Sequence, residues 1–329
     1  MQPIASLLRE HGVDVAAVLR ECGLPSTALD DANAQLSFRM GGCLFQRAAW
    51  ALQRADFGLL VGQRFELASL GLLGDLVRQA PTLGAALHSL VRFIHLQDRG
   101  SVLYLRRPDV GPVAIGYAIH DDEVPGSALI YDAVMAMVLG TLRELCGASF
   151  SAAELHLAHA APADTSPYRR LFGVPVVFDE PHSELLFDRY WLDAPVAGAG
   201  DDTLVALRRA AQAAEAVDPP HLDERVRVAV RVLLATGDVS APRLAEALGL
   251  HERTLRRHLA QTGARLQHIV ADERCHVAKQ LLRETELAVQ DIGWALGYAD
   301  DTSFVRAFRG WCGCTPGQWR AAAREVAKV

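Results

Sequence analysis

One pattern occurs twice in the last third of the chain, 48 residues apart: Leu244-Ala-Glu-Ala-Leu-Gly-Leu-His-Glu-Arg-Thr-Leu-Arg-Arg-His-Leu259 and Ile292-Gly-Trp-Ala-Leu-Gly-Tyr-Ala-Asp-Asp-Thr-Ser-Phe-Val-Arg-Ala-Phe308. In each copy a short apolar helix ends at a glycine, Gly249 or Gly297, because glycine adopts the left-handed conformation that stops a helix at little cost. A polar turn and a second helix follow. The repeat therefore predicts two helix-turn-helix units in one chain.

The second helix of the first copy separates apolar from basic residues. It is expected to begin at His251 or Glu252 and to end near Gln261, with Leu255 and Leu259 packed inward. Three arginines lie on its remaining faces: Arg253, Arg256 and Arg257. Guanidinium groups this close together repel one another unless anions are nearby, and a DNA major groove offers base acceptors flanked by phosphates. These arginines are therefore predicted to contact DNA; a solvated helix face is the alternative.

The corresponding helix of the second copy is expected to run from Asp300 or Asp301 to Trp311, with Phe304 and Phe308 buried. Its outward-facing residues are Thr302, Val305, Arg306 and Arg309. We expect Arg306 to contact a base and Arg309 to contact a phosphate. One of the two aspartates should cap the helix, because negative charge is stabilised at a helix N-terminus. We refer to the second helices of the two copies as the first and second recognition helices.

A helix expected from residue 265 to residue 283 connects the two copies. Nineteen residues at about 1.5 Å each span about 28 Å, close to the roughly 34 Å between successive major grooves on one side of B-form DNA. A lead helix at 223–235 and a last helix beginning at Thr315-Pro316 complete the unit, and Ser240 is expected to cap the first helix of the first copy. The predicted domain, residues 222–329, is thus all-α and holds both recognition helices on one rigid connector.

Composition and charge agree with this organisation. Half of the 329 residues are hydrophobic, no run approaches the roughly 18–20 apolar residues of a membrane span, and the N-terminus lacks a signal peptide. The six cysteines show no disulfide-framework spacing, which indicates a reducing cytoplasm. Residues 221–329 hold 16 basic and 13 acidic residues, whereas residues 1–220 hold 17 and 26. A basic end on an acidic body is typical of a DNA-binding domain attached to a domain that does not bind DNA.

The residues before the repeat predict an α+β domain over residues 1–195. The expected helices cover residues 2–22, 82–96 and 127–146. The expected strands cover residues 101–107 and 113–120, with short ones near 154–159, 174–178 and 184–187. Small residues at 196–200 and the Asp-Pro-Pro at 218–220 flank a helix-like stretch, so we place the linker region at 196–221.

Several residues could carry chemistry, but each has a structural explanation that we favour. His156 and His159 could bind a metal, yet residues i and i+3 of a strand face opposite sides of the sheet. Cys312 and Cys314 supply only two of the usual four zinc ligands. We therefore predict no catalytic residue, no metal and no cofactor. An enzyme fused to a DNA-binding tail, using Cys146 or the two histidines, is the alternative.

Two stretches of the C-terminal region carry a family resemblance: Gly297-Tyr-Ala-Asp-Asp-Thr-Ser-Phe-Val-Arg-Ala-Phe-Arg309 and Gly313-Cys-Thr-Pro-Gly-Gln-Trp-Arg320. With the first copy of the repeat they resemble the AraC/XylS family of bacterial transcription regulators over roughly residues 223–325. The resemblance implies base-reading positions at Arg253, Arg256 and Arg257 in the first recognition helix. It implies the same for Asp301, Thr302 and Arg306 in the second. Asp301 replaces the uncharged polar residue often found there, so the resemblance implies base reading by the second helix less firmly than by the first.

The N-terminal region resembles the arabinose-binding-type effector domain that accompanies such DNA-binding domains. The resemblance rests on Phe57-Gly-Leu-Leu, Leu70-Gly-Leu-Leu-Gly74, Pro81-Thr-Leu-Gly-Ala-Ala-Leu87 and Tyr168-Arg-Arg-Leu-Phe-Gly-Val-Pro-Val-Val-Phe178. It implies a domain that senses a small molecule and can form a homodimer, and the domain's name does not make arabinose the ligand. Candidate effector contacts are Arg92, His95 and Asp98; solvated residues at a helix end are the favoured alternative.

These observations together predict a cytoplasmic, DNA-binding transcription regulator that is not an enzyme. Its expected partners are double-stranded operator DNA, a small-molecule effector on the N-terminal domain and RNA polymerase, with a homodimer as a further expectation. The resemblance favours an activator over a repressor. A ligand-independent regulator whose N-terminal domain only dimerises is the main alternative.

Overall fold

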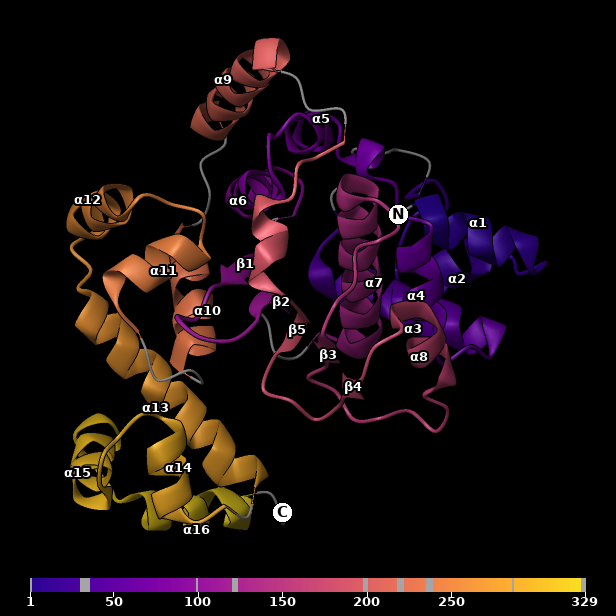
Figure 1. The fold of residues 1–329 in the computed structure, drawn as a ribbon. Helices are drawn as coiled ribbons and strands as arrows, with labels where there is room; N and C mark the ends of the chain where they lie inside the picture. The colour runs from indigo at the N-terminus through magenta and orange to yellow at the C-terminus, as the bar shows by residue number, and fades with distance from the viewer. Residues whose placement is uncertain are drawn as a thin grey trace. The chain divides into compact units, whose positions relative to one another are not determined.

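The computed structural model describes residues 2–29, 36–98, 100–119, 124–197, 201–217, 222–234, 239–285 and 287–326. The chain forms two compact units, Met1–His221 and Leu222–Val329 (Figure 1). The Asp-Pro-Pro at 218–220, the expected end of the lead helix at residue 235, and residues 198–200 of the small-residue stretch lie outside the described residues.

The first unit combines helices with one sheet. Its α-helices are α1 (Gln2–Glu10), α2 (Val15–Glu21), α3 (Phe38–Leu52), α4 (Phe57–Gln63), α5 (Leu72–Arg78), α6 (Leu83–Phe93), α7 (Ser127–Cys146), α8 (Ser166–Phe172) and α9 (Asp201–Val217). The strands are β1 (Ser101–Arg106), β2 (Val113–Ile119), β3 (Glu154–His156), β4 (Val176–Val177) and β5 (Ser183–Phe187). The sheet order is β1-β2-β5-β3-β4, and the pairs are antiparallel except for the parallel pair β3–β4.

One face of the sheet packs on helices α6 and α7 (Figure 1). Because side chains alternate along a strand, Leu103, Ile115 and Leu185 from three adjacent strands point to this face, and all three are buried in the core. The long apolar helix expected at 127–146 is α7, and the predicted strands at 101–107 and 113–120 are β1 and β2.

Helix α7 also packs closely against α4, and two glycines of α4 permit the contact. A Cβ atom on Gly58 would lie 2.2 Å from the carbonyl oxygen of Leu129, and one on Gly62 would lie 2.2 Å from that of Ala133. Real side chains never approach a carbonyl this closely, so only glycine allows the two helices to meet at these turns. The Phe57-Gly-Leu-Leu stretch of the sequence thus has a packing function.

Helix α9 occupies most of the segment in which we placed the linker region. Leu204 and Ala211 are buried in the core of the first unit. Arg92 of α6 forms an ion pair with Glu215 at 3.0 Å, from Nη2 to Oε2. These contacts follow from the amphipathic spacing of the helix, whose apolar side is buried against its own unit.

In the part of the second unit that the structure describes, all regular elements are helices. They are α10 (Leu222–Leu234), α11 (Ala241–Ala247), α12 (Glu252–Thr262), α13 (Leu266–Glu284), α14 (Val289–Ala295), α15 (Asp301–Cys312) and α16 (Pro316–Val326). The fold class expected from the sequence, an α+β unit followed by an all-α unit with two helix-turn-helix motifs and a long bridging helix, is confirmed.

The predicted capping hydrogen bond of Ser240 is wrong. Ser240 is the N-cap residue of α11, but its side chain accepts no capping hydrogen bond. Capping oxygens bond the amide of the second or third helical residue, and the second residue here is Pro242, which has no N–H group. The last helix does carry the expected cap: Gln318 N–H donates to Thr315 Oγ1 at 3.3 Å, and Thr315 N–H donates to Gln318 Oε1 at 3.0 Å.

Candidate nucleic-acid interface

The first recognition helix is α12. A glycine turn and a cap at its N-terminus, together with its buried side, hold it in position. Gly249 has the predicted left-handed backbone, with φ of 65°, where the chain leaves α11. His251 caps α12 through its Nδ1 atom, which accepts from the Arg253 N–H at 3.2 Å. Leu255 and Leu259 are buried as predicted, so the opposite side of the helix faces outward.

The three arginines of α12 are exposed, but they are not equivalent. Arg256 Nε donates to Glu252 Oε1 at 2.7 Å, one helical turn earlier. Arg253 and Arg257 make no side-chain hydrogen bond or ion pair to another described residue. Two guanidinium groups are therefore open to an anionic partner, while the third is held by a carboxylate. The i,i+4 spacing of Glu252 and Arg256 is visible in the sequence, and the sequence analysis missed it.

The second recognition helix is α15, and Asp300 is the aspartate that caps it. Its Oδ1 accepts from the Ser303 N–H and its Oδ2 from the Ser303 hydroxyl, both at 2.8 Å. These bonds hold the pKa of Asp300 below its ordinary value. Asp301 is exposed at the start of the same helix. The helix thus begins with two acidic side chains, one of which is used for capping.

The outward side of α15 carries the remaining predicted contacts. Thr302, Arg306 and Arg309 are exposed, and none of the three makes a side-chain hydrogen bond or ion pair to a described residue. Because α15 also carries acidic residues at its start, its charge is more balanced than that of α12. The first recognition helix therefore attracts a polyanion more strongly than the second.

An aromatic core holds α15 in place. Phe304 and Phe308 are fully buried, as predicted, with their ring centroids 5.9 Å apart. The Phe308 ring centroid lies 6.3 Å from that of Trp311 and 6.4 Å from that of Trp319 on α16. The rings leave little freedom for α15 to rotate about its own axis.

Helix α13 joins the two motifs and is anchored to both. Near its middle, Arg227 Nη1 of α10 donates to Glu273 Oε1 at 3.2 Å, and Arg231 Nε forms an ion pair with Oε2 of the same buried carboxylate at 3.1 Å. Nearer its C-terminal end, Ala278 and Leu282 enter the aromatic core. In Figure 1, α12 and α15 both lie at the left of the second unit. With 19 residues, α13 has the length expected of a connector.

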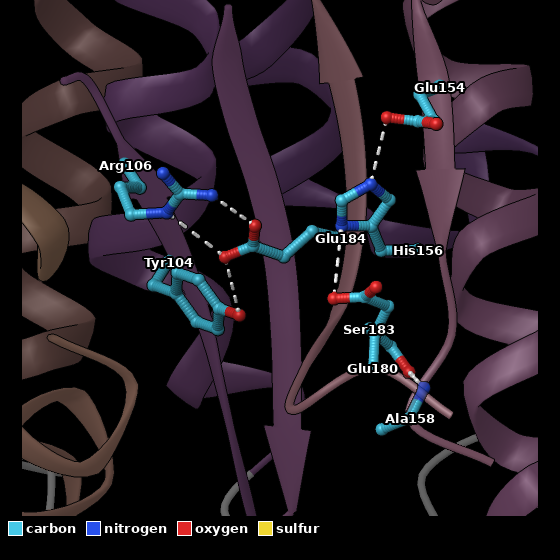
Figure 2. A network of polar contacts seen from close by, with 8 residues as sticks. All are labelled: Tyr104, Arg106, Glu154, His156, Ala158, Glu180, Ser183 and Glu184. Atoms are coloured by element: carbon cyan, nitrogen blue, oxygen red, sulfur yellow. Dashed lines mark hydrogen bonds and ion pairs between the residues drawn. The ribbon is translucent and has the colours of Figure 1, made fainter. Parts of the chain in front are cut away.

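Polar residues of the first unit that could carry chemistry are engaged in internal bonds. Tyr104 lies across Gly116, where any side chain would strike its ring, and its hydroxyl donates to Glu184 Oε1 at 3.1 Å (Figure 2). Arg106 binds both oxygens of the same carboxylate. Figure 2 shows this network spanning β1 and β5 over β2. It satisfies a buried carboxylate and joins strands that are not neighbours.

The two histidines singled out in the sequence have different partners. His156 Nε2 bonds Glu154 Oε2 at 2.9 Å (Figure 2). His159 donates from Nε2 to Asp132 Oδ1 and from Nδ1 to the Ala160 carbonyl, each at 3.0 Å. Burial lowers the pKa of His159, but the hydrogen bond and charge of Asp132 outweigh it, so the pKa is raised. No pattern in the sequence pointed to Asp132, which lies in the apolar helix α7.

The residues noted near the end of α6 are also engaged. Asp98 accepts from the Ser101 hydroxyl at 2.6 Å and from the Tyr117 hydroxyl at 2.8 Å. His95 Nδ1 bonds the Arg92 carbonyl at 2.9 Å. Of the two cysteines, Cys312 lies near Cys275, with the sulfur atoms 3.7 Å apart, and burial raises the pKa of Cys312 to about 11. In the described part of the chain, no group of three or more potential metal-ligating side chains includes these cysteines.

Comparison with known proteins follows the same division into two units. Residues 12–196 match the arabinose-binding domain of AraC transcription regulators, and residues 244–322 match a helix-turn-helix domain family. The chain belongs to the AraC/XylS family of transcription regulators.

Relatives match almost the whole chain. The regulator VirS of Mycobacterium tuberculosis is 28% identical over 316 residues, which cover 96% of this chain and 93% of VirS. The ornithine utilization regulator of Pseudomonas aeruginosa is 28% identical over 327 residues, covering 98% and 95%. The crystal structure of the regulator CdpR from P. aeruginosa is 23% identical, covers 97% of each chain and has a TM-score of 0.47.

This AraC/XylS-family chain is therefore a transcription regulator with an AraC-type helix-turn-helix DNA-binding domain and an arabinose-binding-type N-terminal domain. Among the described residues, no helix combines the length and the apolar character needed to cross a membrane.

Proposed function

We propose that the protein binds operator DNA through both recognition helices and regulates transcription in response to a small-molecule effector held by the first unit. The observation that supports the DNA contact is that each recognition helix has one buried apolar side and one exposed side that carries arginines. Leu255 and Leu259 hold α12, and Phe304 and Phe308 hold α15. Among the described residues, the outward arginines of both helices have no hydrogen-bond or ion-pair partner, except Arg256.

The proposed contacts are those predicted from the sequence. In α12 they are Arg253, Arg256 and Arg257, and in α15 they are Asp301, Thr302, Arg306 and Arg309. Arginine binds guanine through two parallel hydrogen bonds and also binds phosphates, so free guanidinium groups serve both purposes. The contact of Arg256 with a base depends on Glu252, because Arg256 must leave the Glu252 carboxylate before it reaches a base.

Effector control is the second part of the proposal. Effector binding would shift the first unit between two states that differ in how readily the second unit engages DNA or RNA polymerase. The ornithine utilization regulator is named for the use of a metabolite, which supports a small metabolite as the effector here. We further propose that the protein acts in the cytoplasm as an activator and forms a homodimer, as the family resemblance favours.

The DNA contact is tested with the double variant Arg253→Gln/Arg257→Gln. The operator is first located by footprinting on genomic fragments, and affinity is measured by fluorescence anisotropy at fixed salt. Each lost contact should cost about 1–3 kcal/mol, so affinity should fall by at least about 30-fold. The charge-matched control is Arg20→Gln/Arg209→Gln in the first unit, which should bind like the wild type. Unchanged affinity in the α12 variant would reject α12 as a recognition helix.

The effector is tested separately from DNA binding. A screen of metabolites by thermal shift should find a compound that raises the unfolding temperature of the full chain, because a ligand bound only to the native state stabilises it. A first unit that serves only for dimerisation would show no such compound, while its unfolding temperature would still rise with protein concentration.

A further inference from the structure

A cavity of about 460 Å³ lies beside α8 and the edge strand β4 in the first unit. Small-molecule sites in proteins have volumes of roughly 300–1,000 Å³ and combine apolar walls with a few polar groups. The lining residues are Thr165, Arg169, Gly173, Val174, Pro175, Val176 and Phe178. We propose that this cavity binds a small organic carboxylate with an apolar body. The proposal rests on the effector control proposed above and assigns that effector a site and a chemical class.

The charge in the cavity is a single guanidinium that makes no hydrogen bond or ion pair to a described residue, although its charge, with that of Arg170, acts on exposed Asp164 and helps to lower the pKa of that carboxyl. Arg169 is exposed, lines the cavity and makes no side-chain hydrogen bond or ion pair to another described residue. Its neighbour on α8, Arg170, differs in that it donates to Ser166 Oγ at 3.1 Å. Among the described residues that line the cavity, Arg169 alone is charged. An anion is therefore the ligand that the cavity can recognise by charge.

The edge of the sheet supplies a second polar group. Leu155 N–H donates to the Pro175 carbonyl at 3.0 Å, and Leu157 N–H donates to the Val177 carbonyl at 2.9 Å. Successive residues of a strand turn their backbone groups to opposite sides, so the amide and carbonyl of Val176, which lies between these two, face the open edge. Since β4 is the last strand of the sheet, a bound carboxylate can accept a hydrogen bond from this amide.

The remaining wall is apolar and selects for a ligand with an apolar body. Val174, Pro175, Val176 and Phe178 provide it. A bare inorganic anion would leave this surface in contact with water, whereas a hydrophobic substituent covers it and gains about 25 cal/mol for each Å² removed from water. The combination of one free guanidinium with this wall thus favours an organic acid over phosphate or sulfate.

One lining residue connects the cavity to the interior of the unit. The Phe178 ring centroid lies 5.3 Å from that of Tyr168 and 5.7 Å from that of His159. Both of these residues bond the buried carboxylate of Asp132 on α7, Tyr168 from its hydroxyl at 2.7 Å and His159 at 3.0 Å. A ligand that moves the Phe178 ring would therefore displace Tyr168 and His159, whose hydrogen bonds to Asp132 hold α7.

The other polar clusters of the unit do not offer such a site. The Glu184 carboxylate in Figure 2 is bonded by Tyr104 and Arg106, and His156 is bonded by Glu154. Each of these groups has its partner within the fold. Arg169 differs because no hydrogen bond or ion pair to a described residue holds its guanidinium group, and the carboxylate on which its charge acts, Asp164, is exposed.

The test uses the full-length protein and defined probes in isothermal titration calorimetry. Benzoate and hexanoate carry the proposed carboxylate and an apolar body, and benzamide and hexanamide are their neutral counterparts. At least one acid should bind saturably, and its amide should bind about tenfold more weakly or worse, because a charge-assisted hydrogen bond contributes at least that factor. Inorganic phosphate should compete poorly with the acid.

Two variants and one control locate the binding. Arg169→Gln should weaken acid binding about tenfold or more, and Val176→Asp should abolish it by placing a carboxylate in the wall. Arg170→Gln, on the same helix but already bonded to Ser166, should bind like the wild type. Circular dichroism confirms that each variant is folded.

The outcomes separate this site from effector control in general. Absence of saturable binding by either acid up to about 10 mM, or equal binding by Arg169→Gln and wild type, would overturn the proposed site. A metabolite that alters DNA binding equally in wild type and Arg169→Gln would leave effector control intact and reject this cavity. An acid that binds here, loses affinity in Arg169→Gln and changes DNA affinity supports both proposals.

Discussion

Replacing Asp132 by asparagine should destabilise the first unit strongly. Asp132 is 2% exposed and accepts from two donors, the Tyr168 hydroxyl and His159 Nε2. An asparagine is neutral and offers one acceptor oxygen in place of two, so it removes the charge that pairs with His159 and cannot accept from both groups as the carboxylate does. Removing one partner of a buried ion pair typically costs about 3–5 kcal/mol, a large part of the roughly 5–15 kcal/mol that stabilises a domain.

The pair of Asp132 and His159 makes the free energy of unfolding of the first unit depend on pH. The direction of this dependence follows because His159 is charged when it is protonated. The pKa of His159 is raised above its ordinary value of 6.5 in the folded chain. The stability that this group contributes is therefore fully present below about pH 6.5 and is lost as the pH rises through the folded pKa. In the wild type, the free energy of unfolding should fall over this window, and in Asp132→Asn this part of the decrease should vanish.

Urea unfolding of the full chain at several pH values, fitted with a separate transition for each unit, measures both effects. Tyr168→Phe is the matched control, because it removes one neutral donor and leaves the charged pair intact. It should cost about 1 kcal/mol and keep the pH dependence. A loss below about 1 kcal/mol in Asp132→Asn, or an unchanged pH profile, would show that the carboxylate and the histidine are not paired as described.

Two further predictions concern the second unit. Glu252→Gln releases Arg256 from an exposed ion pair worth about 0.3–0.5 kcal/mol and removes a negative charge facing DNA, so operator affinity in fluorescence anisotropy should rise by about two- to tenfold at low salt. Weaker binding would show that Glu252 itself contacts the operator. Phe308→Ala should cost about 3–5 kcal/mol in the unfolding of the second unit, because the ring is fully buried, whereas the half-buried Val305→Ala should cost much less. Equal losses in the two variants would mean that the aromatic core does not hold α15.

The second unit was largely predictable because its determinants are local. Gly249 and Gly297 mark where helices end, and Phe304 and Phe308 mark a buried face, and all four positions agree with the structure. These signals depend on residues only a few positions apart. The connecting helix was also predicted to within one residue at each end.

The first unit was less predictable because its decisive contacts join distant residues. Asp132 lies 27 residues from His159 and 36 from Tyr168, and no periodicity within α7 reveals that its one buried carboxylate meets both. The cavity beside α8 and β4 is lined by residues 165–178 alone, but it depends on how the chain turns from α8 into β4, which no periodicity in the sequence reveals. The burial of α9 against the first unit was not predicted, because the small residues at 196–200 indicated a linker there.

The anchoring of α13 to both motifs constrains how this regulator can evolve. An α-helix turns about 100° per residue, so one residue inserted between Glu273 and Ala278 would rotate the second motif to another side of the connector. Insertion of seven residues would restore the orientation but displace the motif by about 10 Å along the axis. Under the proposed mode of binding, point substitutions can therefore change which bases are preferred, whereas the spacing of the two half-sites in any operator is inherited unchanged.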